Sequence, residues 1–163
     1  MSERPDRKDA RMVGLAVGVV AVVVVTALFS GDDAPSRREP GAYTQHVVER
    51  TIDRYERDGR QATLRFVNSL ESVDGQWYPF IIDHDGYTIA HHNPAMIRRD
   101  PSERVDSTGY FYGDDVLAAT DEGRWVSYVF HNPDTGQEQR KHTWVVRHDG
   151  LIFGSGWYEV SGS

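Results

Sequence analysis

The sequence predicts an α+β fold in which helices come first and a five-stranded antiparallel sheet follows, with one transmembrane helix ahead of both. Three observations predict this order. A charge-free apolar run occupies residues 12–29, helical periodicity fills residues 43–70, and short aromatic or β-branched runs separated by turn residues fill residues 77–153. The 163 residues, 39% of them apolar, are enough for one compact domain with a short appendage.

The first element is the apolar run at residues 12–29, MVGLAVGVVAVVVVTALF. As a helix it would extend roughly 27 Å, close to the thickness of the hydrocarbon core of a bilayer. Four basic and three acidic residues precede it and two aspartates follow it, which orients residues 1–11 toward the cytoplasm. We therefore expect a cytoplasmic tail, a single membrane anchor and an extracytoplasmic remainder. A signal peptide cleaved near residues 25–27 is the alternative.

The next segment, residues 30–42, is small, charged and proline-containing, which is typical of a flexible linker. The folded domain is then expected at residues 43–163. Apolar residues recur at helical spacing from Tyr43 to Tyr55, and Asp58-Gly59 supplies a stop, which predicts a long amphipathic helix. A second, shorter helix continues the period from Ala62 to Leu70.

Five strands are expected, each a run of aromatic or β-branched residues, at 77–82, 87–90, 125–130, 143–146 and 151–153. Asp85-Gly86 and Asp149-Gly150 are two-residue hairpin signals, because both positions of such a turn need positive φ. Strands one and two, and strands four and five, should therefore pair antiparallel. About thirty residues separate strands two and three, with a short helix expected at 114–120, and an insert of this length often carries function.

Composition argues against several classes of function. The chain has no cysteine, so it has no disulfide framework, thiolate zinc site or cysteine nucleophile. The formal net charge of -7 opposes binding to nucleic acid. The seven histidines include no HExxH, and neighbours such as His91 and His92 should point to opposite faces of a strand, so we expect no metal site and no cofactor. Ser155 lies in a strand and not in a GxSxG elbow, so we expect no enzyme.

Four motifs carry a resemblance to a known family. They are GRQATL at 59–64, VDGQWYPFIID at 73–83, IAHHNP at 89–94 and WVSYVFHNPDTGQEQRKHTWVVRHDGLIFGSGWYE at 125–159. Together they resemble a single Cache domain, the extracytoplasmic PAS-like sensor domain of bacterial chemoreceptors, sensor kinases and cyclases. The resemblance implies a long helix packed on one face of the sheet and a ligand pocket between the other face and the insert. Arg98 departs from the family's pattern, which usually has glycine there.

The resemblance also implies a small ligand, a carboxylate or an amino-acid-like molecule. The candidate ligand-binding residues are Tyr78, His91, Tyr110, Tyr112, Tyr128, Lys141 and Thr143. Lys141 matches the lysine of the family's lysine-to-aromatic motif, here KHTW, and its ammonium group would hold an anion. By strand alternation Lys141 and Thr143 share one face while Trp144 faces the other way, so we expect the lysine face to line the pocket. Each candidate also has a structural interpretation, with Tyr78 as core and His91 as a partner of backbone carbonyls.

No output domain follows the fifth strand, so we expect the domain to signal through a partner membrane protein or through a second copy that contacts the helix at 43–57. One alternative is a structural or assembly subunit that keeps the fold without a ligand, and a third class is an enzyme whose site lies hidden in the acidic insert. A polar and aromatic cavity under the insert would favour the sensor, whereas a filled interior with an exposed apolar patch would favour the subunit.

Overall fold

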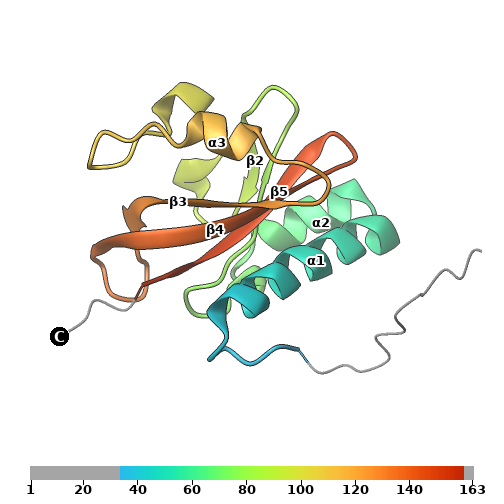
Figure 1. Ribbon diagram of the computed structural model, residues 1–163. Helices are drawn as coiled ribbons and strands as arrows, with labels where there is room; N and C mark the ends of the chain where they lie inside the picture. The colour runs from blue at the N-terminus through green and yellow to red at the C-terminus, as the bar shows by residue number, and fades with distance from the viewer. Residues whose placement is uncertain (1–33, 160–163) are drawn as a thin grey trace, which may run out of the picture. The chain divides into compact units, whose positions relative to one another are not determined.

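The computed structural model describes residues 34–159, which form a five-stranded antiparallel sheet with helices on both faces (Figure 1). The helices are α1 (Pro40–Asp58), α2 (Arg60–Val67) and α3 (Gly113–Leu117). The strands are β1 (Phe80–Ile82), β2 (Thr88–His91), β3 (Arg124–His131), β4 (Glu138–His148) and β5 (Leu151–Tyr158). Their order across the sheet is β2-β1-β5-β4-β3. The predicted α+β fold is therefore confirmed.

α1 covers one face of the sheet, where it packs mainly against β5 and β4 (Figure 1). The expected long helix is confirmed, but it begins at Pro40, three residues earlier than predicted. Proline suits the first turn of a helix because the N–H that it lacks would have no intrahelical partner there. The side chains at the centre of this face are apolar and fully buried; they include Val48, Val67, Ile81 and Phe153.

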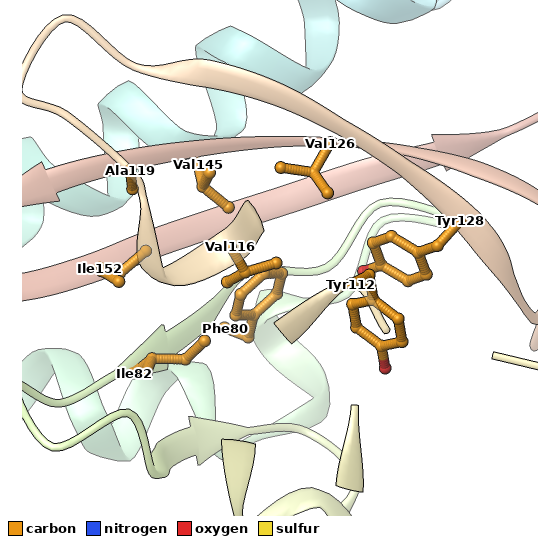
Figure 2. Packing of buried hydrophobic residues seen from close by; sticks show 9 residues of the cluster. All are labelled: Phe80, Ile82, Tyr112, Val116, Ala119, Val126, Tyr128, Val145 and Ile152. Atoms are coloured by element: carbon orange, nitrogen blue, oxygen red, sulfur yellow. The ribbon is translucent and has the colours of Figure 1, made fainter. Parts of the chain in front are cut away.

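The insert between β2 and β3 covers the opposite face, and α3 is its one α-helix among the described residues (Figure 1). Figure 2 shows nine buried hydrophobic residues that form the cluster on this side, with Val116 of α3 beside Phe80 and the strand residues around them. α3 ends at Leu117, three residues earlier than expected. Arg147 of β4 donates hydrogen bonds to the carbonyls of Leu117 and Ala119, at 2.6 and 3.0 Å, and so satisfies carbonyls at the end of this helix.

The two predicted hairpins form, but only one has the predicted turn. Asp149 and Gly150 both have positive φ, 49° and 73°, as a two-residue turn requires. In the first hairpin only Gly86 has positive φ, at 90°. The loop is longer there, because Gly86 N donates to Asp83 O and Asp83 N donates to Tyr87 O, at 3.1 and 2.9 Å. The prediction of a two-residue turn at Asp85-Gly86 was therefore wrong.

Strand lengths also differ from the prediction. β1 begins at Phe80 because Pro79 has no N–H to donate to a ladder, and Trp77 instead forms an isolated bridge with Asp74. β4 and β5 are longer than expected, and they pair continuously from Lys141 with Tyr158 to the turn. Lys141 consequently lies inside a strand and not at its entry.

No helix within residues 34–159 is both long and apolar enough to cross a membrane. The predicted tail at 1–11, the predicted span at 12–29 and the first residues of the predicted linker lie outside the described residues.

Candidate functional site

Two glycines of β5 leave the centre of the sheet without side chains on the face that the insert covers. A Cβ atom at Gly154 would lie 2.2 Å from the ring of Phe80, and one at Gly156 would lie 2.6 Å from Cε of Lys141. The phenylalanine ring and the lysine stem therefore lie directly on the backbone of β5. This arrangement lets Lys141 of β4 extend across β5 toward β1.

A cavity of about 50 Å³ lies above this floor, between the sheet and the insert. Five of the seven predicted ligand-binding residues line it, namely Tyr78, His91, Tyr112, Tyr128 and Lys141. The other lining residues, which the sequence did not indicate, are Phe80, Ile82, Thr88, Met96, Arg99, Arg104, Val116 and Phe130. This described lining contains no aspartate or glutamate.

Lys141 is buried, with 2% of its surface exposed. Its Nζ donates a hydrogen bond to the hydroxyl of Tyr78 at 2.7 Å. The same atom lies 4.1 Å from the ring centre of Tyr78, 5.0 Å from that of Tyr158 and 5.4 Å from that of Phe130. Aromatic rings attract an ammonium group but carry no net charge. The positive charge of Lys141 is therefore solvated by rings and a hydroxyl, and none of the described side chains forms an ion pair with it.

Tyr78 connects the cavity to both ends of the domain. Its hydroxyl shares a hydrogen bond of 2.8 Å with that of Tyr158, which in turn donates to the carbonyl of His131 at 2.9 Å. The backbone N–H of Tyr158 donates to the side chain of Gln76 at 2.8 Å. Trp77, the neighbour of Tyr78, donates from its indole to Thr44 near the start of α1 at 3.0 Å. Residues 74–78 thus contact the first helix and the last strand together.

Tyr112 and Tyr128 form a stacked pair that walls one side of the cavity (Figure 2). Their ring centres lie 3.9 Å apart and their planes differ by 5°. Thr143 does not line the cavity; its hydroxyl donates to the hydroxyl of Tyr128 at 3.0 Å, so the threonine positions a wall residue. Burial raises the pKa of Tyr112 and of Tyr128, and both phenols therefore remain neutral.

His91 and His92 are stacked on each other, with ring centres 4.5 Å apart, and both contact the ring of Tyr78. The prediction that they point to opposite faces was wrong, because β2 ends at His91 and strand alternation no longer applies to His92. The pKa of the His91 imidazole falls to about 3, mainly through burial and then through His92, Lys141 and Arg99. The pKa of His92 is lowered by burial and by Lys141. Both rings are accordingly neutral near pH 7.

Arg104 is the most informative residue that the sequence did not indicate. It is buried, with 4% of its surface exposed, and its Nη2 donates to Gly86 O at 2.8 Å and Thr88 Oγ1 at 3.1 Å. Its Nη1 is buried without a hydrogen-bond partner. A buried guanidinium nitrogen without an acceptor is costly, so this atom marks a position where an acceptor would be stabilised.

The insert is fastened to the edge of the sheet by Asp106, whose carboxylate accepts hydrogen bonds from its own loop and from the backbone N–H of Val129 in β3, at 2.9 Å. These bonds, that of the Thr108 hydroxyl foremost, lower the pKa of Asp106 to about 2. Tyr110, a predicted ligand-binding residue, lies in this loop and is 40% exposed. Its hydroxyl donates to Asp115, and it does not line the cavity.

Metal binding and nucleophilic chemistry at Ser155 are the other kinds of chemistry to consider in the same residues. Among residues 34–159 no group of three or more histidine, aspartate or glutamate side chains is arranged to hold a metal ion. Ser155 is buried in β5 and donates to the carbonyl of Tyr78 at 3.1 Å, so its hydroxyl serves the structure. The geometry favours binding of a small molecule in the cavity.

Comparison with known proteins gives one family and several similar structures. The family model described as single Cache domain 2 matches residues 42–159. No curated protein matches the chain significantly.

The similar structures share the fold at low sequence identity. A crystal structure of a methyl-accepting chemotaxis protein from Vibrio parahaemolyticus has a TM-score of 0.64 at 14% identity, covering 75% of this chain and 90% of that chain. A Cache chemosensory domain whose structure explains its recognition of carboxylic acids has a TM-score of 0.58 at 21% identity, covering 75% and 95%. The periplasmic sensor domain of a chemotaxis protein has a TM-score of 0.54 at 24% identity, covering 70% and 86%.

Proposed function

The chain belongs to the single Cache domain 2 family, and from this premise we propose that it is a membrane-anchored extracytoplasmic module that binds a small carboxylate and signals through a partner protein. The anchor in this proposal is the charge-free run at residues 12–29. The protein has a sensory function in this proposal and no catalytic one.

One observation carries the ligand class: two buried cations, Lys141 and Arg104, line a cavity whose described lining contains no carboxylate. The aromatic residues cannot balance these charges, because burial raises the pKa of Tyr112, Tyr128 and Tyr158 and keeps their phenols neutral. A buried charge is stabilised by an opposite charge and by hydrogen bonds. An anionic ligand supplies both.

The lining favours a simple carboxylate over an amino acid. An amino acid would bring an ammonium group into the cavity together with its carboxylate, and the described lining offers no acidic side chain to pair with it. The volume of about 50 Å³ is enough for several water-sized groups, which suits an acid of two to four carbons.

The test is a thermal-shift and calorimetric screen of the full chain against acetate, propanoate, butanoate, glycine and alanine. We expect the carboxylates to stabilise the domain by about 2.7 kcal/mol at a hundredfold excess over the dissociation constant, and the amino acids to act more weakly.

Lys141→Met should lower carboxylate affinity at least tenfold, because it keeps much of the stem but removes the charge. The melting temperature of the ligand-free protein should change little.

Arg65→Gln is the matched control, since Arg65 is exposed on α2 and is not one of the residues that line the cavity. It should leave affinity unchanged. The proposal fails if no carboxylate binds, or if Lys141→Met binds carboxylates as well as the unaltered chain does.

For the partner, we propose a second copy that packs α1 against α1 in parallel. On the outer side of α1 the acidic residues Glu49 and Asp53 form one stripe at a spacing of four, and His46 and Arg50 form another beside it. In a parallel pair with twofold symmetry, the acidic stripe of each helix faces the basic stripe of the other. An antiparallel pair would place like charges together.

Because the chain has no cysteine, a single introduced cysteine reports this contact cleanly. His46→Cys should form a disulfide-linked dimer in native membranes, whereas Arg65→Cys on α2 should not. Crosslinking that is equally strong at both positions would contradict the parallel α1 pair and leave a separate membrane protein as the partner.

The alternative function, a structural or assembly subunit, has one observation in its favour. Val105, Tyr110 and Phe111 are exposed on the loop of the insert, where Val105 and Phe111 face each other in an isolated bridge. If this surface is the functional one, Phe111→Ser abolishes association with the partner while small acids fail to bind. Under the sensor proposal Phe111→Ser leaves carboxylate affinity unchanged.

A further inference from the structure

We propose that the ligand carries two carboxylate groups, one held by Lys141 and the other by Arg104. This inference rests on the proposed function, because it names the ligand of the same cavity more closely. It makes Arg104 the residue that determines specificity between acids with one and with two carboxylates.

The first argument is the free hydrogen-bonding capacity at two separate points of the cavity. Lys141 Nζ has three protons and one hydrogen bond among the described residues, to Tyr78. Arg104 uses Nη2 for Gly86 and Thr88 and keeps Nη1 without a partner, although the side chain is 96% buried. Each cation therefore has donors available for its own carboxylate.

The second argument is the position of the two cations. Lys141 belongs to β4 and reaches across Gly156 of β5, whereas Arg104 belongs to the insert and is fixed to the hairpin that joins β1 to β2. They approach the cavity from different elements, and both line a space of only about 50 Å³. In this proposal a short diacid spans the cavity and gives one carboxylate to each cation.

The third argument is the balance of charge. Arg99 adds a third positive charge to the lining, but it is partly exposed and donates to the carbonyl of Glu103 at 2.6 Å. Asp100 acts on Arg104 electrostatically, yet its carboxylate does not line the cavity and accepts hydrogen bonds from Ser102. A monocarboxylate would leave one of the two buried cations without a counter-charge, and a dicarboxylate would not.

The decisive experiment compares acids of equal carbon number on the unaltered full chain by isothermal calorimetry, at a pH where every carboxyl is ionised. The pairs are propanoate with malonate and butanoate with succinate. We expect the better diacid to bind at least tenfold more tightly than its monoacid partner. Inorganic phosphate, a dianion with a single centre, should bind no better than the monoacids.

Two variants assign the second carboxylate. Arg104→Gln keeps a donor for Gly86 but removes the charge, so it should abolish the preference for diacids while changing monoacid affinity less than threefold. Arg104→Lys restores a charge and should recover part of the preference. The exposed Arg65→Gln is the control and should retain the full preference.

The outcomes separate this inference from the proposed function. Equal affinity for monoacids and diacids, or tighter binding of phosphate, overturns the two-carboxylate ligand while leaving a carboxylate sensor in place. A diacid preference that survives in Arg104→Gln overturns the role of Arg104. Binding of neither class overturns both proposals. The comparison of acids on the unaltered chain decides the ligand class even if both variants of Arg104 fail to fold.

Discussion

The two faces of the sheet are built from the same strands but have different chemistry. The face under α1 is apolar and fully buried at its centre, with Val48, Ile81 and Phe153 in contact. Between the other face and the insert, Lys141 and Arg104 are buried beside an apolar cluster, and both line the cavity. Neighbouring residues along a strand point to opposite faces of the sheet, so the same strand can present apolar residues on one face and polar residues on the other. The difference indicates that the face under α1 holds the domain together and that the face under the insert is available for binding.

The largest expected effect on stability comes from a substitution on the face under α1. Phe153→Ala removes a fully buried ring and should lower the free energy of unfolding by about 3–5 kcal/mol, because the packed helix cannot fill the cavity left behind. Urea unfolding followed by circular dichroism measures this loss. If the cost is below about 1 kcal/mol, the face under α1 is not the principal source of stability.

On the face under the insert, Gly156→Ala should change both stability and binding. The new Cβ would lie 2.6 Å from Cε of Lys141 and 2.7 Å from the carbonyl oxygen of His142, so the lysine must move and the ladder must adjust. We expect a loss of about 1–3 kcal/mol of stability together with weaker carboxylate binding. Gly41→Ala is the control, since its Cβ would meet Trp125 at 3.7 Å, an ordinary contact. Unchanged binding in Gly156→Ala would show that the position of the Lys141 stem is unimportant.

Lowering the pH should reduce the free energy of unfolding through a buried histidine on the face under the insert, at a pH above the range in which surface carboxylates become protonated. The pKa of folded His91 is about 3 and its ordinary value is 6.5, so between these values the unfolded chain binds more protons than the folded one. The contribution of His91 to the free energy of unfolding is therefore fully present above about pH 6.5. It is lost as the pH decreases, by up to about 1.4 kcal/mol for each pH unit. Urea unfolding between pH 7 and 5 measures the slope.

His91→Asn tests the assignment, because its side-chain oxygen can accept the hydrogen bond that Asn93 N donates to His91 Nδ1 at 2.9 Å, but it does not titrate. The slope should flatten, with the remainder due to His92, whose pKa is also lowered. An unchanged slope would assign the acid sensitivity to other groups.

The smallest expected effect concerns the wall of the cavity. Thr143→Val removes the hydrogen bond to the hydroxyl of Tyr128 at nearly constant volume and should cost about 0.5–1.5 kcal/mol. Thermal unfolding measures it, and Thr143→Ser should retain most of the stability because it keeps the hydroxyl. A valine variant as stable as the unaltered chain would make Thr143 a packing residue only.

The sequence was sufficient to predict the order of the elements and the two faces of β4. Lys141 and Thr143 were predicted to share one face with Trp144 on the other, and the structure confirms it: Lys141 and Thr143 are buried, while Trp144 packs with the cluster under α1. This prediction succeeded because strand alternation depends only on neighbouring residues, and its period of two can be recognised in the sequence itself. The membrane span and the limits of the domain stay predictions.

The cavity was predicted less well, because its composition depends on contacts between distant segments. Arg104 lies in a stretch of the insert without periodicity, and nothing local distinguishes it from the exposed arginines. Its burial comes from Gly86 and Thr88, which are 18 and 16 residues away in the chain. Conversely, Tyr110 and Tyr112 look alike in the sequence, yet only Tyr112 lines the cavity. At Arg98 the sequence was informative: the resemblance implied glycine there, and Arg98 adopts a positive φ of 64°, a conformation that favours glycine.

Residues 74–78 touch the beginning of α1 and the end of β5, and Tyr78 within them shares its hydroxyl with the ammonium group of Lys141. Under the proposed function, a carboxylate bound at Lys141 would compete with Tyr78 for the ammonium group and would therefore act at a stretch that contacts both the first helix and the last strand. The start of the first helix and the end of the last strand would then respond together to one ligand.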